Sequence, residues 1–413
     1  MKQIPLLLAA LGCLLIPTAS TAANWPAWRG ANGDGITTET ELPLSWNRTE
    51  NVVWRVDLSE PGNSTPVVWG DRLFVTQTES GNKRRNLLCF DAGSGRLLWK
   101  SGVEVSVDER THETNPHASA SAVTDGERVI CWFGSAGVVA FDLEGLELWR
   151  ADLGPHSHRF GYGGSPVLHG DHVFLNFGPG AREFVVALNK TTGKEIWRHE
   201  SPTPGQDDIF GTWSTPVVVN WKGQAQLVSA LRGELAGLDP TTGKVIWYTP
   251  SLGIQAKSSP VVGEGVVVMA GDMQSSELVV RLGGEGDVTD SHILWKRNPA
   301  RRRVGSGIIH KGHIYSVQTS GIADCVKLET GEVVWDERLR GAGANNAVWS
   351  SPVLAGDRVY IMNQSGDVIV FRAAPQFEVL ATNSLGETSN SSVVPANGRI
   401  FLRTHQSLWC IGE

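Results

Sequence analysis

Two loops of the sequence carry histidines at spacings that could suit a metal ion. One reads Arg110-Thr-His-Glu-Thr-Asn-Pro-His117 and the other reads His156-Ser-His-Arg-Phe-Gly-Tyr-Gly163. Imidazole is among the commonest ligands of transition metals, so two such loops that converge in the fold could hold one ion. The candidate metal ligands are His112, His117, His156 and His158.

The first loop differs from the helical His-Glu-x-x-His metal motif. That motif needs its two histidines four residues apart on one face of a helix. Here His112 and His117 are five residues apart and Pro116 lies between them, which excludes a regular helix. The alternative is that these are exposed loop histidines with ordinary hydrogen bonds. Glu113 and Asn115 in the same loop supply an oxygen pair from which a Ca²⁺ site could begin.

Tryptophans mark the elements that must position these loops. A period of roughly 40 to 50 residues, with several short strands per unit, is typical of a β-propeller rather than a helical solenoid. Seven of the sixteen tryptophans recur at that period and end short, strand-like apolar runs: Trp54, Trp99, Trp149, Trp197, Trp247, Trp295 and Trp335.

Each repeat has the same order of parts. One unit opens with Ser214-Thr-Pro-Val-Val-Val219, which contains a β-branched run. Its Pro stands at the start of the strand, where a backbone N–H is not needed for a hydrogen bond to the neighbouring strand. The turn Asp239-Pro-Thr-Thr-Gly243 follows, with Gly free to adopt a positive φ. Trp247 ends the unit, and its ring can fill the wedge between two blades. Inner strands begin near residues 64, 119, 165, 214, 258, 306, 350 and 391, which predicts eight blades.

The two ends of the chain are predicted to share one blade. The last unit, residues 390–411, lacks a terminal Trp strand, whereas Asn51–Leu58 is a terminal strand with no inner strand before it. Pairing the two would complete the blade and hide a sheet edge. The seventh unit is degenerate, because Phe377–Ala381 holds no Trp. We therefore predict an all-β, eight-bladed β-propeller with four-stranded antiparallel blades, closed by the N-terminal strand joining the last blade.

In a propeller the loops that lead into the inner strands surround the mouth of the axial channel, where ligands bind. These loops hold more His, Arg, amide and aromatic groups than solubility requires. They suit a protein segment or a small polar or anionic ligand; the alternative is a solvated charge cluster. The predicted ligand-binding residues are His112, Glu113, Asn115, His117, His158, Arg159, Tyr162, Trp213, Lys257, Arg303, Asn345 and Trp349.

The repeated pattern Ser-x-Pro-Val-Val…Leu-Asp-x-x-Thr-Gly-x-x-x-Trp resembles the pyrroloquinoline-quinone-like (PQQ-like) repeat over nearly all of the chain. The opening Trp25–Gly35 also resembles the lead-in of secreted bacterial proteins with this repeat. The resemblance implies the propeller fold. It leaves the activity open, because the fold is shared by quinoprotein dehydrogenases and by non-enzymatic propellers of the BamB type.

For a dehydrogenase, the resemblance implies PQQ held with Ca²⁺ and a carboxylate base that takes the substrate proton. The adjacent Cys pair of those enzymes is absent, and no matching Asp base stands in a channel loop. Gly-x-Ser-x-Gly, P-loop and EF-hand motifs are also absent. We therefore predict a binding or scaffolding propeller without catalytic residues. The alternative is a PQQ-dependent alcohol or sugar dehydrogenase with PQQ and Ca²⁺ as cofactors.

The first 23 residues are predicted to be a secretory signal. Lys2 precedes the apolar run Leu6–Ile16, and the small residues Thr18–Ala23 follow it. Lipid attachment at Cys13 is an alternative. Residues 24–413 would then form one propeller domain, exported as a monomer to the periplasm, the cell envelope or the medium. No later segment is long and apolar enough to span a bilayer.

Charge and cysteine content exclude two further classes of protein. With 36 basic and 43 acidic side chains the net charge is −7, unlike the basic footprint of a nucleic-acid binder. None of the cysteines forms a Cys-x-x-Cys pair, so neither a metal knuckle nor a redox pair is expected. Disulfides and buried thiols remain alternatives for Cys89, Cys131, Cys325 and Cys410.

Overall fold

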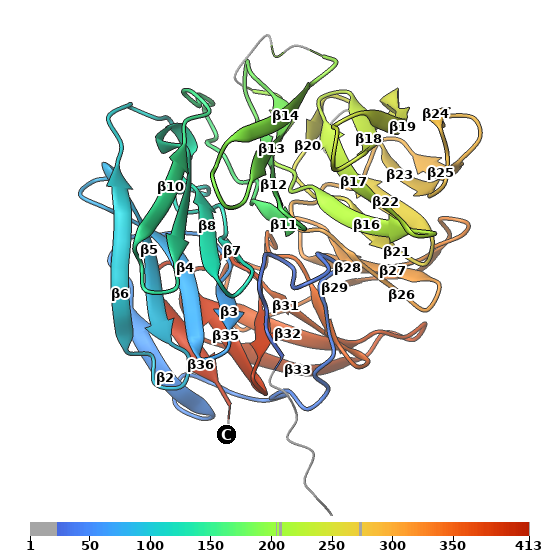
Figure 1. Ribbon diagram of the computed structural model, residues 1–413. Coiled ribbons are helices and arrows are strands. Elements are labelled where there is room, and N and C mark those ends of the chain that lie inside the picture. The colour runs from blue at the N-terminus through green and yellow to red at the C-terminus, as the bar shows by residue number, and fades with distance from the viewer. Residues whose placement is uncertain (1–22, 204, 206–208, 272–274, 413) are drawn as a thin grey trace, which may run out of the picture.

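A computed structural model describes residues 23–412, apart from residues 204, 206–208 and 272–274. Residues 1–22 of the expected signal peptide, which include Cys13, lie outside these described residues. The described chain is almost entirely β-structure, and its helical segments are the short 3-10 turns η1 (Gly134–Ala136) and η2 (Pro250–Leu252). Figure 1 shows twisted sheets arranged around a common axis as the blades of a wheel. The predicted eight-bladed propeller is confirmed within the described residues.

The first four blades follow the chain in order, each from its inner strand outward. Blade 1 contains β3 (Val67–Trp69), β4 (Arg72–Glu79), β5 (Arg84–Asp91) and β6 (Leu97–Glu104). Blade 2 contains β7 (Val123–Thr124), β8 (Arg128–Trp132), β9 (Val138–Asp142) and β10 (Glu147–Ala151). Blade 3 contains β11 (Val167–His169), β12 (His172–Phe177), β13 (Phe184–Asn189) and β14 (Glu195–Glu200). Blade 4 contains β16 (Val217–Trp221), β17 (Gln224–Leu231), β18 (Glu234–Leu238) and β19 (Val245–Thr249).

The last four blades continue the same order. Blade 5 contains β21 (Val261–Gly263), β22 (Val266–Ala270), β23 (Glu277–Arg281) and β25 (Ile293–Arg297). Blade 6 contains β26 (Ile308–His310), β27 (His313–Val317), β28 (Ile322–Lys327) and β29 (Val333–Arg338). Blade 7 contains β30 (Val353–Ala355), β31 (Arg358–Met362), β32 (Asp367–Arg372) and β33 (Val379–Ser384). Blade 8 contains β34 (Val394–Ala396), β35 (Arg399–Arg403), β36 (Ser407–Ile411) and the N-terminal β2 (Val52–Asp57).

Strand β2 closes the wheel as predicted. It pairs antiparallel with β36, with Trp54 opposite Cys410 and Asp57 opposite Ser407. The N-terminal part of the chain therefore supplies the outer strand of the blade whose three inner strands are the last of the chain. Pairing the two ends hides the edge that β36 would otherwise expose.

The repeated tryptophans join neighbouring blades. The Trp54 indole N–H donates to the carbonyl of Ala92 in the next blade at 3.0 Å, and five more make the equivalent bond: Trp99, Trp149, Trp197, Trp295 and Trp335. The ring also covers the Gly of the next turn. Gly95 has φ +72°, and a Cβ there would lie 2.7 Å from the Trp54 ring. This Gly therefore serves both the turn and the approach of the indole.

Trp247 departs from this pattern because blade 5 has no short turn to receive it. Its indole N–H donates instead to the side chain of Gln226 in its own blade. Between β23 and β25 of blade 5 the chain forms a longer excursion that carries β24 (Gly286–Asp287). This strand adds to the outer edge of blade 4, parallel to β19, with Gly286 opposite Trp247.

Two further short pairings involve segments outside the regular blades. β1 (Ile36–Thr37) pairs in parallel with the inner strand β30 of blade 7. β15 (Gly211–Thr212) pairs in parallel with β20 (Gln255–Ala256), so the loops that lead into blades 4 and 5 are joined. Among the described residues, no helix is both long and apolar enough to cross a membrane.

The cysteines of the described chain are buried free thiols. Cys89, Cys131, Cys325 and Cys410 each lie within the blade cores and form no disulfide with one another. Burial raises the pKa of Cys89 to about 12, so its unreactive thiol form dominates at neutral pH. Of the two alternatives open from the sequence, the structure supports buried thiols.

Candidate functional site

A closed ring of hydroxyl groups surrounds the propeller axis. In each blade, a Ser or Thr stands just before the inner strand. Its Oγ accepts a hydrogen bond from the backbone N–H of the equivalent residue in the preceding blade. The first bond joins Thr65 N to Ser121 Oγ at 2.8 Å, and the last joins Ser392 N to Thr65 Oγ1 at 3.3 Å. The members found in the described chain are Thr65, Ser121, Ser165, Thr215, Ser259, Ser306, Ser351 and Ser392.

The ring lines a cavity of about 290 Å³ on the axis. Every ring residue except Ser306 contributes to its lining. The rest of the lining comes from the loops that lead into the inner strands, as expected for the axial channel of a propeller. Those additional lining residues are Trp28, Asn63, His112, Thr114, Asn115, Ser119, Phe160, Gly163, Trp213, Gln255, Lys257, Val304, Trp349 and Asn390.

The N-terminal segment, residues 25–37, forms the floor of this cavity. Trp25 pairs with Val68 of blade 1, and the carbonyl of Pro26 accepts from Thr124 N of blade 2. β1 continues the segment along the inner edge of blade 7. In Figure 1 this dark blue segment lies at the centre of the wheel. Because it contacts inner strands on several sides of the axis and carries Trp28 into the lining, the cavity has its opening at the other end.

Arg29 anchors the floor through bonds to backbone carbonyls. Its guanidinium is buried and donates to the carbonyls of Gly33, Asp34, Ser306 and Gly307. Burial lowers the pKa of Arg29 to about 10, and the group remains charged at neutral pH. These bonds tie the floor segment to blade 6.

Amide side chains hold the loops around the mouth. Asn63 and Asn390 both donate to the carbonyl of Thr114, at 2.9 and 3.1 Å. Asn115 donates to the carbonyls of Phe160 and Tyr162, at 2.6 and 3.0 Å. The loops of blades 1, 2, 3 and 8 are therefore fastened to one another.

The structure brings five of the predicted ligand-binding residues to the cavity and places the others elsewhere. Those in the lining are His112, Asn115, Trp213, Lys257 and Trp349. Glu113, Arg159 and Asn345 are exposed outside it, and Arg159 stacks over Phe160 at 5.0 Å. Those buried outside the lining are His117, His158, Tyr162 and Arg303.

His117 belongs to a buried polar group beside the cavity. Its Nδ1 lies 3.7 Å from the carboxylate of Glu109, which also pairs with Arg85 at 3.0 Å. Burial, followed by the charge of Arg85, lowers the pKa of His117 to about 4, so the ring is neutral at pH 7. The Tyr162 hydroxyl donates to the backbone carbonyl of His117 at 2.7 Å. These groups pack the join between blades 1, 2 and 3.

The four candidate metal-ligating histidines do not gather around one centre. His112 lies at the cavity, whereas His156 packs edge-on against Trp132 and Tyr162 in the apolar core. His158 lies edge-on to Trp213, with ring centroids 5.0 Å apart. Within the part of the chain that the structure describes, no group of three or more His, Cys, Asp or Glu side chains is arranged to hold a metal ion.

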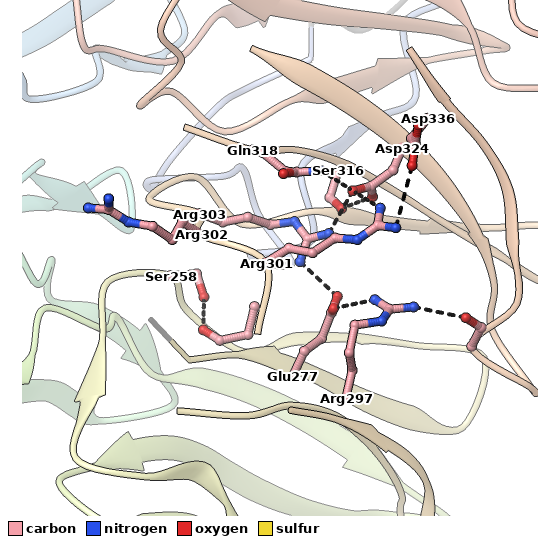
Figure 2. A network of polar contacts seen from close by, with 12 residues as sticks. Ser258, Glu277, Arg297, Arg301, Arg302, Arg303, Ser316, Gln318, Asp324 and Asp336 are labelled. Atoms are coloured by element: carbon pink, nitrogen blue, oxygen red, sulfur yellow. Dashed lines mark hydrogen bonds and ion pairs between the residues drawn. The ribbon is translucent and has the colours of Figure 1, made fainter. Parts of the chain in front are cut away.

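Arg303 joins two blades rather than facing the cavity (Figure 2). Its guanidinium donates to Glu277 of β23 and to Asp324 of β28, both at 2.8 Å. Arg297 pairs with Glu277 and Arg301 pairs with Asp324 on the outer side of the same network. Burial alone would raise the pKa of Asp324, but Arg303, Ser316 and Arg301 together hold it below its ordinary value. The network is a buried ionic contact between blades 5 and 6.

The sequence matches the family described as outer membrane protein assembly factor BamB over residues 44–221 and again over residues 181–413. The chain belongs to this family. BamB of Yersinia pestis is 20% identical over 327 residues, which cover 74% of this chain and 75% of that protein. The predicted PQQ-like repeat is thereby confirmed.

Solved structures show the same fold as this member of the BamB family. The crystal structure of BamB from Moraxella catarrhalis has a TM-score of 0.61 at 14% identity and covers 87% of this chain and 96% of that chain. A europium-containing methanol dehydrogenase has a TM-score of 0.70 at 10% identity and covers 95% of this chain and 98% of that chain. At such identities the likeness establishes the propeller fold and leaves the activity to the site.

The residues around the cavity do not fit a quinone held with Ca²⁺. Ca²⁺ takes six to eight oxygen ligands, among which carboxylates are prominent. No Asp or Glu is present among the described residues that line the cavity, and Glu113 lies exposed outside it. The amide nitrogen of Asn115 is bonded to two backbone carbonyls. Among the described lining residues, this BamB-family cavity therefore offers none of the carboxylate donors that such a site requires.

Sequence reasoning missed the hydroxyl ring and Trp28. A signal for the ring was present, because the position before the inner-strand Pro is Ser or Thr in every repeat, even where Pro itself is replaced, as after Ser121, Ser306 and Ser392. A residue type kept at one position of every repeat of a closed wheel recurs at one radius around the axis, but the repeat alone gives neither that radius nor the bonds between its members. For Trp28 no such repeat exists.

Proposed function

We propose that this protein is an exported binding propeller that holds a segment of a partner protein at the mouth of its axial cavity, without catalysis. Membership of the BamB family supports the binding role. The name of its relatives, outer membrane protein assembly factor, supports a scaffolding role in the cell envelope. In this proposal residues 1–23 direct export, and residues 24–413 act as a single monomeric propeller domain.

The composition of the cavity mouth carries the proposal. Phe160, Trp213 and Trp349 are half-buried aromatic residues beside amide and hydroxyl groups. Aromatic rings with polar neighbours are the side chains most enriched where proteins bind one another. The loops that carry them are fastened by hydrogen bonds, so little ordering is needed when a partner binds.

Site-specific photo-crosslinking tests the proposal. A photoreactive phenylalanine analogue replaces Phe160 or Trp349 in the full chain expressed in its natural cells, and the control position is Lys244, exposed in the outer turn of blade 4. We expect one defined protein adduct from the two mouth positions and none from Lys244. Adducts of equal yield at all three positions, or none at the mouth, would contradict it.

A quinoprotein dehydrogenase is the second candidate, because the propeller fold that this chain shares with a methanol dehydrogenase is compatible with either activity. Adding PQQ and Ca²⁺ in excess to purified protein separates the two. We expect an unchanged melting temperature and no quinone absorbance after desalting, because carboxylate ligands are missing from the described cavity lining. A raised melting temperature with retained absorbance would replace the binding proposal with the dehydrogenase.

A further inference from the structure

Each hydroxyl of the axial ring keeps one donor and one acceptor for a ligand. A Ser or Thr hydroxyl has one O–H donor and two acceptor lone pairs. One lone pair of each ring oxygen accepts a backbone N–H from the preceding blade. Among the described residues, none of these hydroxyls donates a hydrogen bond to another protein group. All of them except Ser306 line the cavity, so matched neutral donors and acceptors surround its axis.

The side-chain amide of Gln255 lies in the cavity wall without a protein partner. Gln255 is 6% exposed and lines the cavity, and its backbone is fixed by the pairing of β20 with β15. Its backbone N–H faces Ser275 Oγ at 3.4 Å, whereas its side chain makes no hydrogen bond to another described residue. A primary amide has two N–H donors and one carbonyl acceptor, and burial without partners is costly. The unmet bonds of this amide therefore point to a polar ligand in the cavity.

The polar groups that remain available to a ligand are neutral hydroxyls and amides. Lys257 is the single Lys or Arg among the described lining residues, and it already has an interaction partner in the protein. The same described lining includes no Asp or Glu. Asn115 adds a neutral acceptor, because its amide nitrogen is bonded while its amide oxygen has no partner among the described residues. An uncharged ligand whose oxygens each donate and accept matches this set.

Aromatic rings lie at the floor and at the rim of the same cavity. Trp28 belongs to the floor, and the half-buried rings of Phe160, Trp213 and Trp349 belong to the loops at the mouth. The Trp213 indole N–H donates to the carbonyl of Gly161 at 3.0 Å, which holds that ring in place. An aromatic face is negative and attracts C–H groups that neighbouring oxygens have made positive. The cavity therefore suits a ligand that carries C–H faces as well as hydroxyls.

We propose that the axial cavity binds a neutral saccharide, as a free sugar or as the end of a longer saccharide chain. A pyranose carries hydroxyls around its edge and C–H groups on its faces, so its edge meets the hydroxyl ring and Gln255 while its faces meet the aromatic rings. A volume of about 290 Å³ is at the small end of ligand sites and suits about one or two sugar rings. Because residues 25–37 close the floor, a longer chain enters only by its end. This binding goes beyond the proposed function and needs no protein partner.

Saturation-transfer NMR on the full chain tests the proposal. The probes are the methyl β-pyranosides of glucose, galactose, mannose and N-acetylglucosamine, with glucuronate as a charged sugar and cyclohexanol as a six-membered ring that keeps a single hydroxyl. We expect saturable binding of at least one neutral glycoside, with a Kd on the order of 1 mM or below. Cyclohexanol should bind at least about tenfold more weakly, because most of the hydrogen bonds are lost. Cellotetraose and chitotetraose separate the two sources, since equal or tighter binding of a tetrasaccharide indicates a chain end and binding of the glycoside alone indicates a free sugar.

Two glutamine variants locate the site. Gln255→Met keeps the length of the side chain and removes its amide, so we expect the glycoside to bind about tenfold more weakly. The matched control Gln224→Met changes the exposed first residue of β17 and should bind the glycoside like the wild type. The comparison of glycoside with cyclohexanol uses the wild-type chain, so it stands even where Gln255→Met fails to fold.

Several results would overturn the proposal. These are no saturable binding of any sugar, equal binding of glycoside and cyclohexanol, or an unchanged affinity in a folded Gln255→Met variant. Tighter binding of glucuronate than of every neutral sugar would also overturn it and would indicate a site for an acidic ligand. Crosslinking at Phe160 and Trp349 is a separate measurement. A defined protein adduct without sugar binding would leave the proposed function standing while saccharide binding fails, and sugar binding without an adduct would do the reverse.

Discussion

The backbone N–H of Ser392 in blade 8 donates to Oγ1 of Thr65 in blade 1 across 3.3 Å. This bond closes the hydroxyl ring at the axis, while the pairing of β2 with β36 closes the same wheel at its rim. The two ends of the wheel are thus joined both near the axis and at the rim. The inner closure lines the candidate site, so the stability of the wheel and the shape of the site depend on some of the same atoms.

Replacing Thr65 tests the inner closure. Thr65→Val keeps the shape of the side chain and leaves the buried N–H of Ser392 without its acceptor, which should lower the free energy of unfolding by about 1–3 kcal/mol. Thr65→Ser retains the oxygen and is the matched control. Urea unfolding measures both, and equal stability of the two variants would show that the ring bond contributes nothing.

Removing the outer closure should affect cooperativity. Deleting residues 51–58 removes β2 and exposes the edge of β36, so we expect a broader urea transition with a smaller m-value. Val53→Ser alters an exposed side chain of the same strand and leaves its pairing intact. It should unfold like the parent. A deletion variant with the parent's transition would contradict closure through β2.

The ionic contact between blades 5 and 6 predicts a large effect from one substitution. Arg303→Met leaves Glu277 and Asp324 buried without their shared cation (Figure 2). Breaking a buried pair from one side destabilises by about 3–5 kcal/mol. Arg301→Met removes the outer, more exposed partner of Asp324 and should have a much smaller effect. Similar losses from both would contradict the placement of Arg303.

The same contact predicts how stability depends on pH. The folded pKa of Asp324 lies below its ordinary value. Its contribution to stability is therefore fully present above about pH 4 and is lost as the pH falls through the folded pKa. In Arg303→Met the carboxylates accept protons more readily, so the destabilisation should shrink on acidification. Chemical unfolding at neutral and acidic pH measures this, and a loss independent of pH would exclude the ionic explanation.

The buried carboxyl group of Glu183 predicts the opposite dependence of stability on pH. Burial, opposed by hydrogen bonds from Thr212 and Arg232, raises the pKa of Glu183 to about 7. Between about pH 4.3 and pH 7 the unfolded chain releases this proton while the folded chain keeps it, so stability falls as pH rises. Glu183→Gln should remove that fall and gain a few kcal/mol relative to wild type above pH 7. Glu332→Gln, at an exposed position, should not. Parallel pH profiles for Glu183→Gln and wild type would contradict the raised pKa.

The candidate site was only partly predictable from the sequence. The loops that surround the cavity could be identified, because each precedes an inner strand of the repeat. The direction of each side chain could not. His112 and Lys257 reach the cavity. His117 and Arg303, from similar loops, turn into the joins between blades, where His117 lies beside Glu109 and Arg303 pairs with Glu277 and Asp324.

The sequence by itself determined the number of blades, the strand that closes the last one and the positions of the docking tryptophans. These follow from a repeated local pattern, since strand period, turn glycine and Trp spacing are all read within one unit. Only the tertiary structure decided that the repeated hydroxyls form one ring and that Trp28 closes the cavity beneath it. Those contacts join residues far apart in the chain, and the surrounding loops have no regular period from which their side-chain directions follow.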